Sequence, residues 1–63
     1  MLKMKVYRVK KMPVPVYSGF VEVYTPEGRF LYRVKSGVDR ITRADAMLDA
    51  RCTAAEMKQE VYA

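Results

Sequence analysis

The residues in this sequence whose types and spacing suit a chemical role are cations, and the chemistry they suit is the binding of anions. Residues 1–35 carry eight Lys or Arg against two Glu, a net charge of +6, whereas residues 36–63 carry four against five, a net charge of −1. A positive element of this kind fits nucleic acid or the acidic surface of another protein. The candidate binding cations are Arg29, Arg33, Lys35, Lys3, Lys5, Lys10 and Lys11.

Catalysis and metal binding lack the residues they need. The sequence contains no histidine, the commonest general base and metal ligand, and Cys52 is its single cysteine. The carboxylate pairs Asp45/Asp49 and Glu56/Glu60 have helical spacing, which is typical of a solvated helix face. The three glycines stand far apart, so they form no phosphate-binding loop. We therefore expect a binding protein rather than an enzyme, with no cofactor and no metal.

The length and composition predict one small domain, residues 1–63. The chain is 51% hydrophobic and 30% charged, which is a globular composition. A domain of this size buries only about 60% of the surface of its unfolded chain, so we expect a stability of a few kcal/mol. A single cysteine excludes an internal disulfide, and no apolar run suits a signal peptide or a membrane span. These features predict a cytoplasmic protein without a membrane partner.

The middle of the chain predicts a β-hairpin. Residues 20–24 and 29–35 flank Thr25-Pro26-Glu27-Gly28, where the positions of Pro and Gly indicate a type I turn closed by a left-handed glycine. Such a turn pairs Thr25 with Arg29 and sets the register of both strands. The predicted cross-strand pairs are Tyr24–Phe30, Val23–Leu31, Glu22–Tyr32, Val21–Arg33 and Phe20–Val34.

A strand before this hairpin and a helix after it complete the predicted fold. Residues 2–11 alternate as a strand does, but the apolar phase changes after Val6, so we expect a β-bulge near Val6 and Tyr7. Residues 36–39 predict a turn. The architecture is then α+β, a three-stranded antiparallel sheet followed by one C-terminal helix (β-β-β-α). Its expected bounds are about 2–11, 19–25 and 29–35 for the strands and about 42–58 for the helix.

The helix signals begin at Thr42. Thr42 with Asp45 resembles a capping box, and a similar pattern at Thr53 leaves open whether the helix continues past Cys52. An apolar stripe is expected to face the sheet. Its members are Ile41, Ala44, Met47, Leu48 and Ala55.

The predicted register divides the hairpin into two faces. An aromatic face should pack under the helix, because it holds the larger apolar area; its members are Phe20, Glu22, Tyr24, Phe30, Tyr32 and Val34. The other face should be exposed, and its members are Val21, Val23, Leu31, Arg29, Arg33 and Lys35. Exposed aliphatic residues in a cluster usually have a partner, so Val21, Val23 and Leu31 join the candidate site.

Residues 19–23, 28–34 and 42–46 together resemble the arm-type, three-stranded-sheet DNA-binding domain of phage-type tyrosine integrases. In that family a hairpin with a Gly turn precedes a Thr-led helix containing an Ala-acid-Ala run. The resemblance implies a sheet that enters the major groove, with Arg29, Arg33 and Lys35 at the matching strand positions. The small basic chain also resembles accessory proteins of phages and prophages, many of which inhibit or redirect a host protein, as anti-CRISPRs do.

Three functions follow as hypotheses. The first is a phage- or mobile-element-type accessory factor that contacts nucleic acid through the basic sheet face. The second is an inhibitor or adaptor, for example an anti-defence protein, that docks on a host protein complex. The third is a homodimer in which the aliphatic face pairs with itself and completes a small core.

Overall fold

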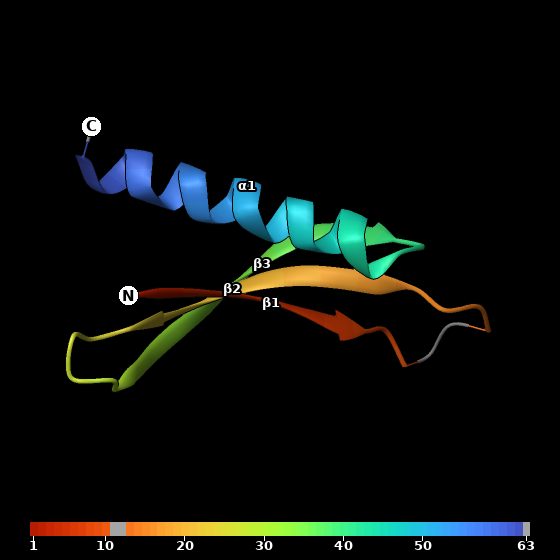
Figure 1. The fold of residues 1–63 in the computed structure, drawn as a ribbon, viewed down its shortest axis with the longest axis horizontal. Coiled ribbons are helices and arrows are strands. Elements are labelled where there is room, and N and C mark those ends of the chain that lie inside the picture. Colours follow the sequence, from red (N-terminus) through yellow and green to blue (C-terminus); the bar gives the residue numbers. More distant parts are fainter. Residues whose placement is uncertain (11–12, 63) are drawn as a thin grey trace.

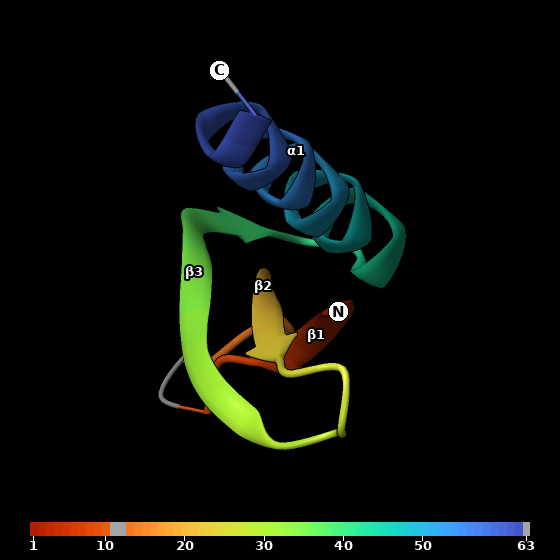
Figure 2. The same ribbon diagram turned by 90° about the vertical axis from the view of Figure 1, so that its left-hand side faces the viewer.

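The computed structural model describes the backbone of residues 1–10 and 13–62, and the side chains as far as Lys58. It contains the strands β1 (Leu2–Arg8), β2 (Tyr17–Tyr24) and β3 (Phe30–Arg40) and the helix α1 (Arg43–Tyr62). The strands form one antiparallel sheet in the order β1-β2-β3, and α1 lies along one of its faces (Figures 1 and 2). The predicted β-β-β-α fold is therefore confirmed.

The turn between β2 and β3 forms as predicted. The backbone N–H of Gly28 donates to the Thr25 carbonyl oxygen at 2.9 Å, and Gly28 has a φ of 91°. The N–H of Thr25 donates to the Arg29 carbonyl oxygen at 2.9 Å. The N–H of Arg29 in turn donates to Oγ1 of Thr25 at 3.1 Å. These bonds confirm the predicted pairing of Thr25 with Arg29.

One extra residue in β3, Leu31, changes the register directly after this turn. Tyr24 pairs with Phe30 as predicted, but Val23 pairs with Tyr32. Because side chains alternate along a strand, this slip of one residue moves every later β3 side chain to the opposite face. The predicted pairs beyond Tyr24 are therefore wrong. The observed partners are Glu22 with Arg33, Val21 with Val34 and Phe20 with Lys35.

β1 pairs with β2 in a single unshifted register, with Leu2 opposite Val23 and Val6 opposite Gly19. The bulge expected near Val6 and Tyr7 is therefore wrong. Plain alternation places the even-numbered apolar residues of β1 toward the helix. The residues directed away from the helix are Lys3, Lys5 and Tyr7.

β3 continues to Arg40 and includes residues 36–39, which the sequence predicts as a turn. A second irregularity in the β2–β3 register accommodates this segment, and Gly37 there has a φ of 79°. The hydroxyl of Ser18 donates to the Val38 carbonyl oxygen at 3.1 Å, which fixes the irregular part to β2. The Ser-Gly pair thus marks a bulge inside a strand and not the end of one.

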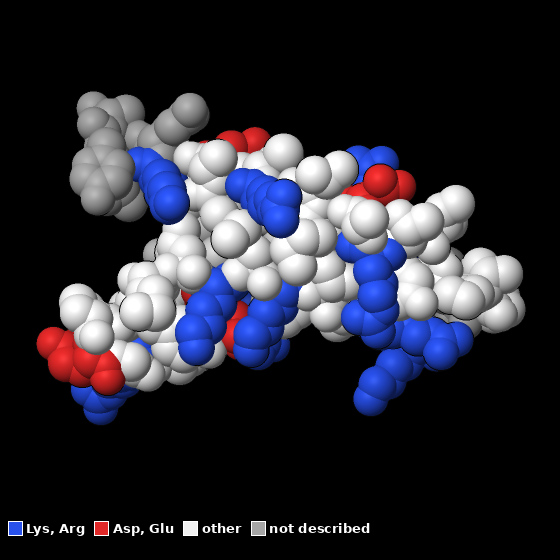
Figure 3. Space-filling view, viewed as in Figure 1, with Lys and Arg blue, Asp and Glu red and all other residues white. Residues whose placement is uncertain are grey.

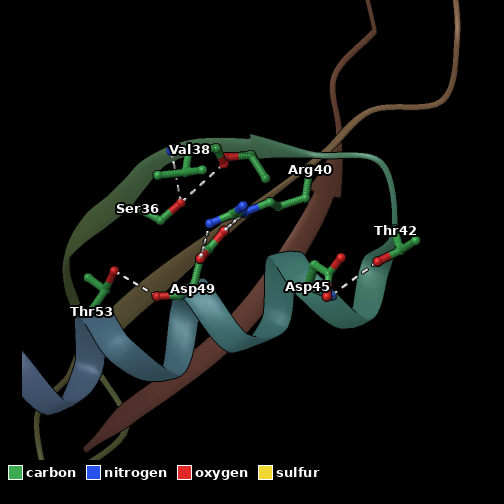
Figure 4. Close-up of polar contacts among 8 residues, drawn as sticks. Ser36, Val38, Arg40, Thr42, Asp45, Asp49 and Thr53 are labelled. Carbon is green, nitrogen blue, oxygen red and sulfur yellow. Dashed lines mark hydrogen bonds and ion pairs between the residues drawn. The ribbon is translucent and has the colours of Figure 1, made fainter.

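The N-terminus of α1 is capped by Thr42. The backbone N–H of Asp45 donates to Oγ1 of Thr42 at 3.2 Å (Figure 4). The helix then runs without a break through Cys52, which answers the question of its continuity. The hydroxyl of Thr53 donates to the Asp49 carbonyl oxygen at 3.0 Å inside the helix, so Thr53 caps no second helix.

An ion pair joins the end of β3 to α1. Nε and Nη2 of Arg40 donate to the two carboxylate oxygens of Asp49 at 2.8 and 3.2 Å (Figure 4). This bidentate bond lowers the pKa of Asp49 and raises that of Arg40. The contact helps to hold the irregular end of β3 against the helix.

The seam between α1 and the sheet consists of small residues. Ala46, Ala50 and Ala54 recur every four residues and are buried. A Cβ added to Gly19 on β2 would collide with the carbonyl oxygen of Ala46 and would lie 3.0 Å from Cβ of Ala50. Gly19 therefore lets the helix backbone approach the sheet closely.

The apolar stripe predicted to face the sheet does not form the seam. Ile41 is 76% exposed and Leu48 is 54% exposed, while Ala44 and Ala55 are also exposed and Met47 is half-buried. Helical periodicity selects the largest apolar side chains, whereas the close approach at the seam requires the smallest ones.

Candidate nucleic-acid interface

The sheet has one face under the helix and one face open. The helix-covered face is mostly aliphatic, with Leu2, Met4, Val6, Val21, Val23, Tyr32 and Val34, and it has Arg8, Tyr17 and Arg40 at one end. The side chains of the opposite face, called the open face below, are Lys3, Lys5, Tyr7, Phe20, Glu22, Tyr24, Phe30, Arg33 and Lys35. The open face therefore combines four cations and four aromatic rings with the carboxylate of Glu22, and the register places Asp39 on the same side at its end, opposite Ser18.

Glu22 organises the centre of the open face. Its Oε1 accepts hydrogen bonds from Nζ of Lys5 at 2.8 Å and from the hydroxyl of Tyr24 at 3.0 Å. Its Oε2 accepts one from Nη2 of Arg33 at 3.1 Å. The side chain of Glu22 is buried beneath these partners, which belong to all three strands. The hydrogen bond from Lys5, with those from Arg33 and Tyr24, lowers the pKa of Glu22 from 4.5 to about 2.

Three of the four positive groups, including Arg33, lie over aromatic rings. Nζ of Lys3 is 4.7 Å from the ring centre of Tyr24, and Nζ of Lys35 is 5.9 Å from that of Tyr7. Cζ of Arg33 lies 5.0 Å from the ring centre of Phe20. Distances within about 6 Å are those at which a cation is attracted to a ring. Rings and cations therefore alternate across the face.

The rings form two pairs, one at each end of the open face. Tyr7 and Phe20 have ring centres 5.7 Å apart at an angle of 56°, and Tyr24 and Phe30 have centres 5.7 Å apart at 89°. Phe20 and Tyr24 are four residues apart on β2, so the two pairs are separated by about 13 Å of strand. Glu22 stands between them.

The charge of the open face is strongly positive. Figure 3 shows several Lys and Arg side chains below the sheet, on the side away from the helix, and further ones on the helix, where Asp and Glu also lie. Lys5 and Arg33 are paired with Glu22. Within the described part of the chain, no carboxylate lies at ion-pair distance from Lys3 or Lys35. Two lysines at opposite edges of the sheet are thus available to an anionic partner.

The structure brings together only part of the predicted site. Lys3, Lys5, Arg33 and Lys35 share the open face. Arg29 is exposed just before β3, and Lys10 is exposed just after β1. Lys11 lies outside the described residues.

The aliphatic part of the predicted site is wrong. Val21 is 0% exposed, and Val23 is partly buried on the helix-covered face. Leu31 is exposed, but it stands at the bulge and has no aliphatic cluster around it on the open face. The aromatic face does not pack under the helix as predicted, although Phe20 itself is buried, at 9% exposed. The slip at Leu31 places Arg33 and Lys35 beside the rings of Phe20 and Tyr24. The aliphatic face predicted for self-pairing is not open as a whole, because Val21 is fully buried under α1.

Five residues of the open face are not among the predicted candidates, namely Tyr7, Phe20, Glu22, Tyr24 and Phe30. The sequence of β1 could have identified Tyr7, because Lys3 and Lys5 alternate with Leu2 and Met4. Reading that alternation straight on to Tyr7 places this ring on the basic face. Phe20 and Glu22 lie on the same face because they pair with Lys5 and Lys3 of β1.

A second surface feature is an apolar groove between α1 and the sheet. Figure 1 shows the C-terminal half of α1 diverging from the strands. Apolar residues of the strands that line the groove include Leu2, Met4, Val23, Tyr32 and Val34, and those of the helix include Ala54 and Met57. Arg51, Glu56 and Lys58 add charges to its lining.

The buried carboxylate predicts a loss of stability in acid. The folded-state pKa of Glu22 is about 2 and its ordinary value is 4.5, so its contribution is complete above pH 4.5 and disappears as the pH falls toward 2. Urea unfolding at pH 2.5, 3.5, 4.5 and 6, followed by circular dichroism, should show this decline. A Glu22→Gln variant should be less stable at pH 6 but less sensitive to acid. Glu27→Gln, at the exposed turn, is the charge control, and identical acid profiles for the chain and Glu22→Gln would contradict the prediction.

Comparison of the chain with known protein families, with curated proteins and with solved structures finds no match. Among the residues that the structure describes, no helix is long and apolar enough to cross a membrane. Within the same residues, no three His, Cys, Asp or Glu side chains are grouped so that they could hold a metal ion. The function proposed below therefore rests on the cations and aromatic rings of the open face.

Proposed function

We propose that this chain is a small non-enzymatic protein that binds nucleic acid through the open face of its sheet. The observation that supports the proposal most directly is the grouping of four cations and four aromatic rings on the one face that the helix leaves uncovered. Phosphates are recognised by Lys and Arg, and nucleobases stack on aromatic rings. Both kinds of contact group are present on this surface.

The charge distribution supports the same proposal. Lys3 and Lys35 have no carboxylate at ion-pair distance in the described residues, so binding a phosphate would break no ion pair seen there. The resemblance of residues 19–23, 28–34 and 42–46 to the arm-type domains of phage-type integrases agrees with a basic sheet as the contact surface. On that resemblance we propose that the chain is an accessory factor of the phage or mobile-element type.

A salt titration tests this function. Fluorescence anisotropy of labelled DNA and RNA oligomers should give an association constant that falls with salt. The logarithm of this constant should decrease linearly with the logarithm of the salt concentration. The expected slope is about −0.9 per phosphate contact for a duplex and about −0.7 for a single strand. Absence of binding to every oligomer at 20 mM salt would reject the function, and so would tight binding that salt does not change.

A protein partner is the second candidate, and the apolar groove between α1 and the sheet is the observation that favours it. In this alternative the chain is an inhibitor or adaptor, such as an anti-defence protein, and its contact residues include Met4 and Tyr32. Exposed apolar surface of this kind commonly marks a protein contact. A Met4→Glu variant should then lose its partner and keep any binding to nucleic acid. If Met4→Glu still binds its protein partner, the groove is not the contact surface, and the partner would be assigned to the open face.

A further inference from the structure

Resting on the proposed function, we infer that the open face binds single-stranded nucleic acid at two nucleotide positions, one over each aromatic pair. The first position is formed by Tyr7, Phe20 and Lys35, and the second by Tyr24, Phe30 and Lys3. Each position therefore contains an aromatic pair and a lysine. The single strand of nucleic acid would run along β2 from one position to the other.

The exposure of the rings favours unpaired bases. Tyr7 is 37% exposed and Phe30 is 44% exposed, so each aromatic pair contains one ring that a base can reach. A surface that reads only duplex phosphates has no use for accessible rings, whereas every unpaired base has a flat face that stacks on them. The rings thus discriminate between a single strand and a duplex.

The lysines couple stacking to phosphate binding. In the free protein, Nζ of Lys3 lies over Tyr24 and Nζ of Lys35 lies over Tyr7. When a base occupies the position over the ring, the displaced ammonium moves on its flexible stem to the adjoining phosphate. Each lysine therefore gives up its contact with the ring and forms an ion pair with the phosphate of the nucleotide whose base stacks there.

The centre of the face keeps the two positions apart. Glu22 holds Lys5 and Arg33 in place by hydrogen bonds of 2.8 and 3.1 Å. The carboxylate neutralises part of their charge, so the centre attracts phosphate less than the two lysines do. The guanidinium of Arg33 also lies near Phe20 and Phe30, at 5.0 and 6.0 Å from their ring centres, and it links the two aromatic pairs.

Binding of dT12, rU12 and a 12-base-pair duplex to the folded chain tests the inference. Single strands, whether dT12 or rU12, should bind at least tenfold more tightly than the duplex. A Tyr7→Leu/Phe30→Leu double variant, which removes a stacking ring from both positions, should bind single strands at least about thirtyfold more weakly than the unaltered chain, with an unchanged salt slope. Tyr32→Leu, an exposed tyrosine on the helix-covered face, is the matched control and should change nothing.

A measurement on the unaltered chain tests the same inference without any variant that could fail to fold. On titration with dT12, the ring proton resonances of Tyr7 and Phe30 should shift, and those of Tyr32 should stay. Equal or tighter duplex binding, or ring resonances that do not move on saturation, would overturn the inference and leave the proposed function in place. Failure of all three oligomers to bind at low salt would instead reject the proposed function itself.

Discussion

A Gly19→Ala substitution should destabilise the fold by about 2–3 kcal/mol, because overpacking a tight contact has a cost of this order. The added Cβ would collide with the carbonyl oxygen of Ala46. A backbone atom cannot rotate away as a side chain can, so the whole of α1 would have to move from the sheet. A domain of this size has a stability of only a few kcal/mol, so a large fraction of the variant should be unfolded at 37 °C. Urea unfolding followed by far-UV circular dichroism measures the change.

Two controls locate the cause of this effect at the seam. Ala44→Leu enlarges an exposed residue of the same helix and should change the stability by less than about 0.5 kcal/mol. Ala50→Gly removes the second atom that the new Cβ approaches, but it should rescue Gly19→Ala poorly, since the carbonyl oxygen of Ala46 stays in place. A Gly19→Ala variant as stable as the unaltered chain would show that α1 does not approach β2 so closely.

Replacing Lys3 and Lys35 together by Met should weaken nucleic-acid binding about tenfold to a hundredfold at low salt. Both residues are expected to hold phosphates, so the slope of log K against log salt should become shallower by about 1.4 for a single strand. Met keeps the apolar stem of each lysine, so the strand pairing is retained. Anisotropy titrations at four salt concentrations provide both numbers.

An Arg51→Met/Lys58→Met variant is the matched control. It removes the same two charges from exposed positions of α1 that line the groove, not the open face. If the open face is the contact surface, this control should keep nearly the full slope. Equal losses in both variants would show that net charge alone attracts the nucleic acid, and the open face would then lose its assigned role.

Features that depend on a few neighbouring residues were predictable from the sequence. The turn at Thr25-Pro26-Glu27-Gly28 and the cap at Thr42 form as their residue types require. Each involves one glycine or one side-chain oxygen acting over three or four residues. The order of strands and helix follows from the same local signals, so the β-β-β-α class was predictable as well.

Features that depend on which surfaces meet were not predictable in the same way. The seam of α1 uses Ala46, Ala50 and Ala54 because Gly19 on a distant strand permits a close approach. Judged by hydrophobicity alone, the stripe containing Ile41 and Leu48 is the stronger candidate. The local sequence of a helix does not give the distance between that helix and the sheet, which decides how large the side chains between them can be.

The sequence by itself determined that the first half of this chain is a basic sheet and that the second half is a nearly neutral helix. Only the tertiary structure decided that Arg33 and Lys35 share a face with the rings and with Glu22. The physical reason is the period of two residues in a β-strand, by which one inserted residue exchanges the faces of all that follow. The insertion at Leu31 places Tyr32 and Val34 on the face that α1 covers, and it thereby leaves the cations beside the aromatic rings in the open.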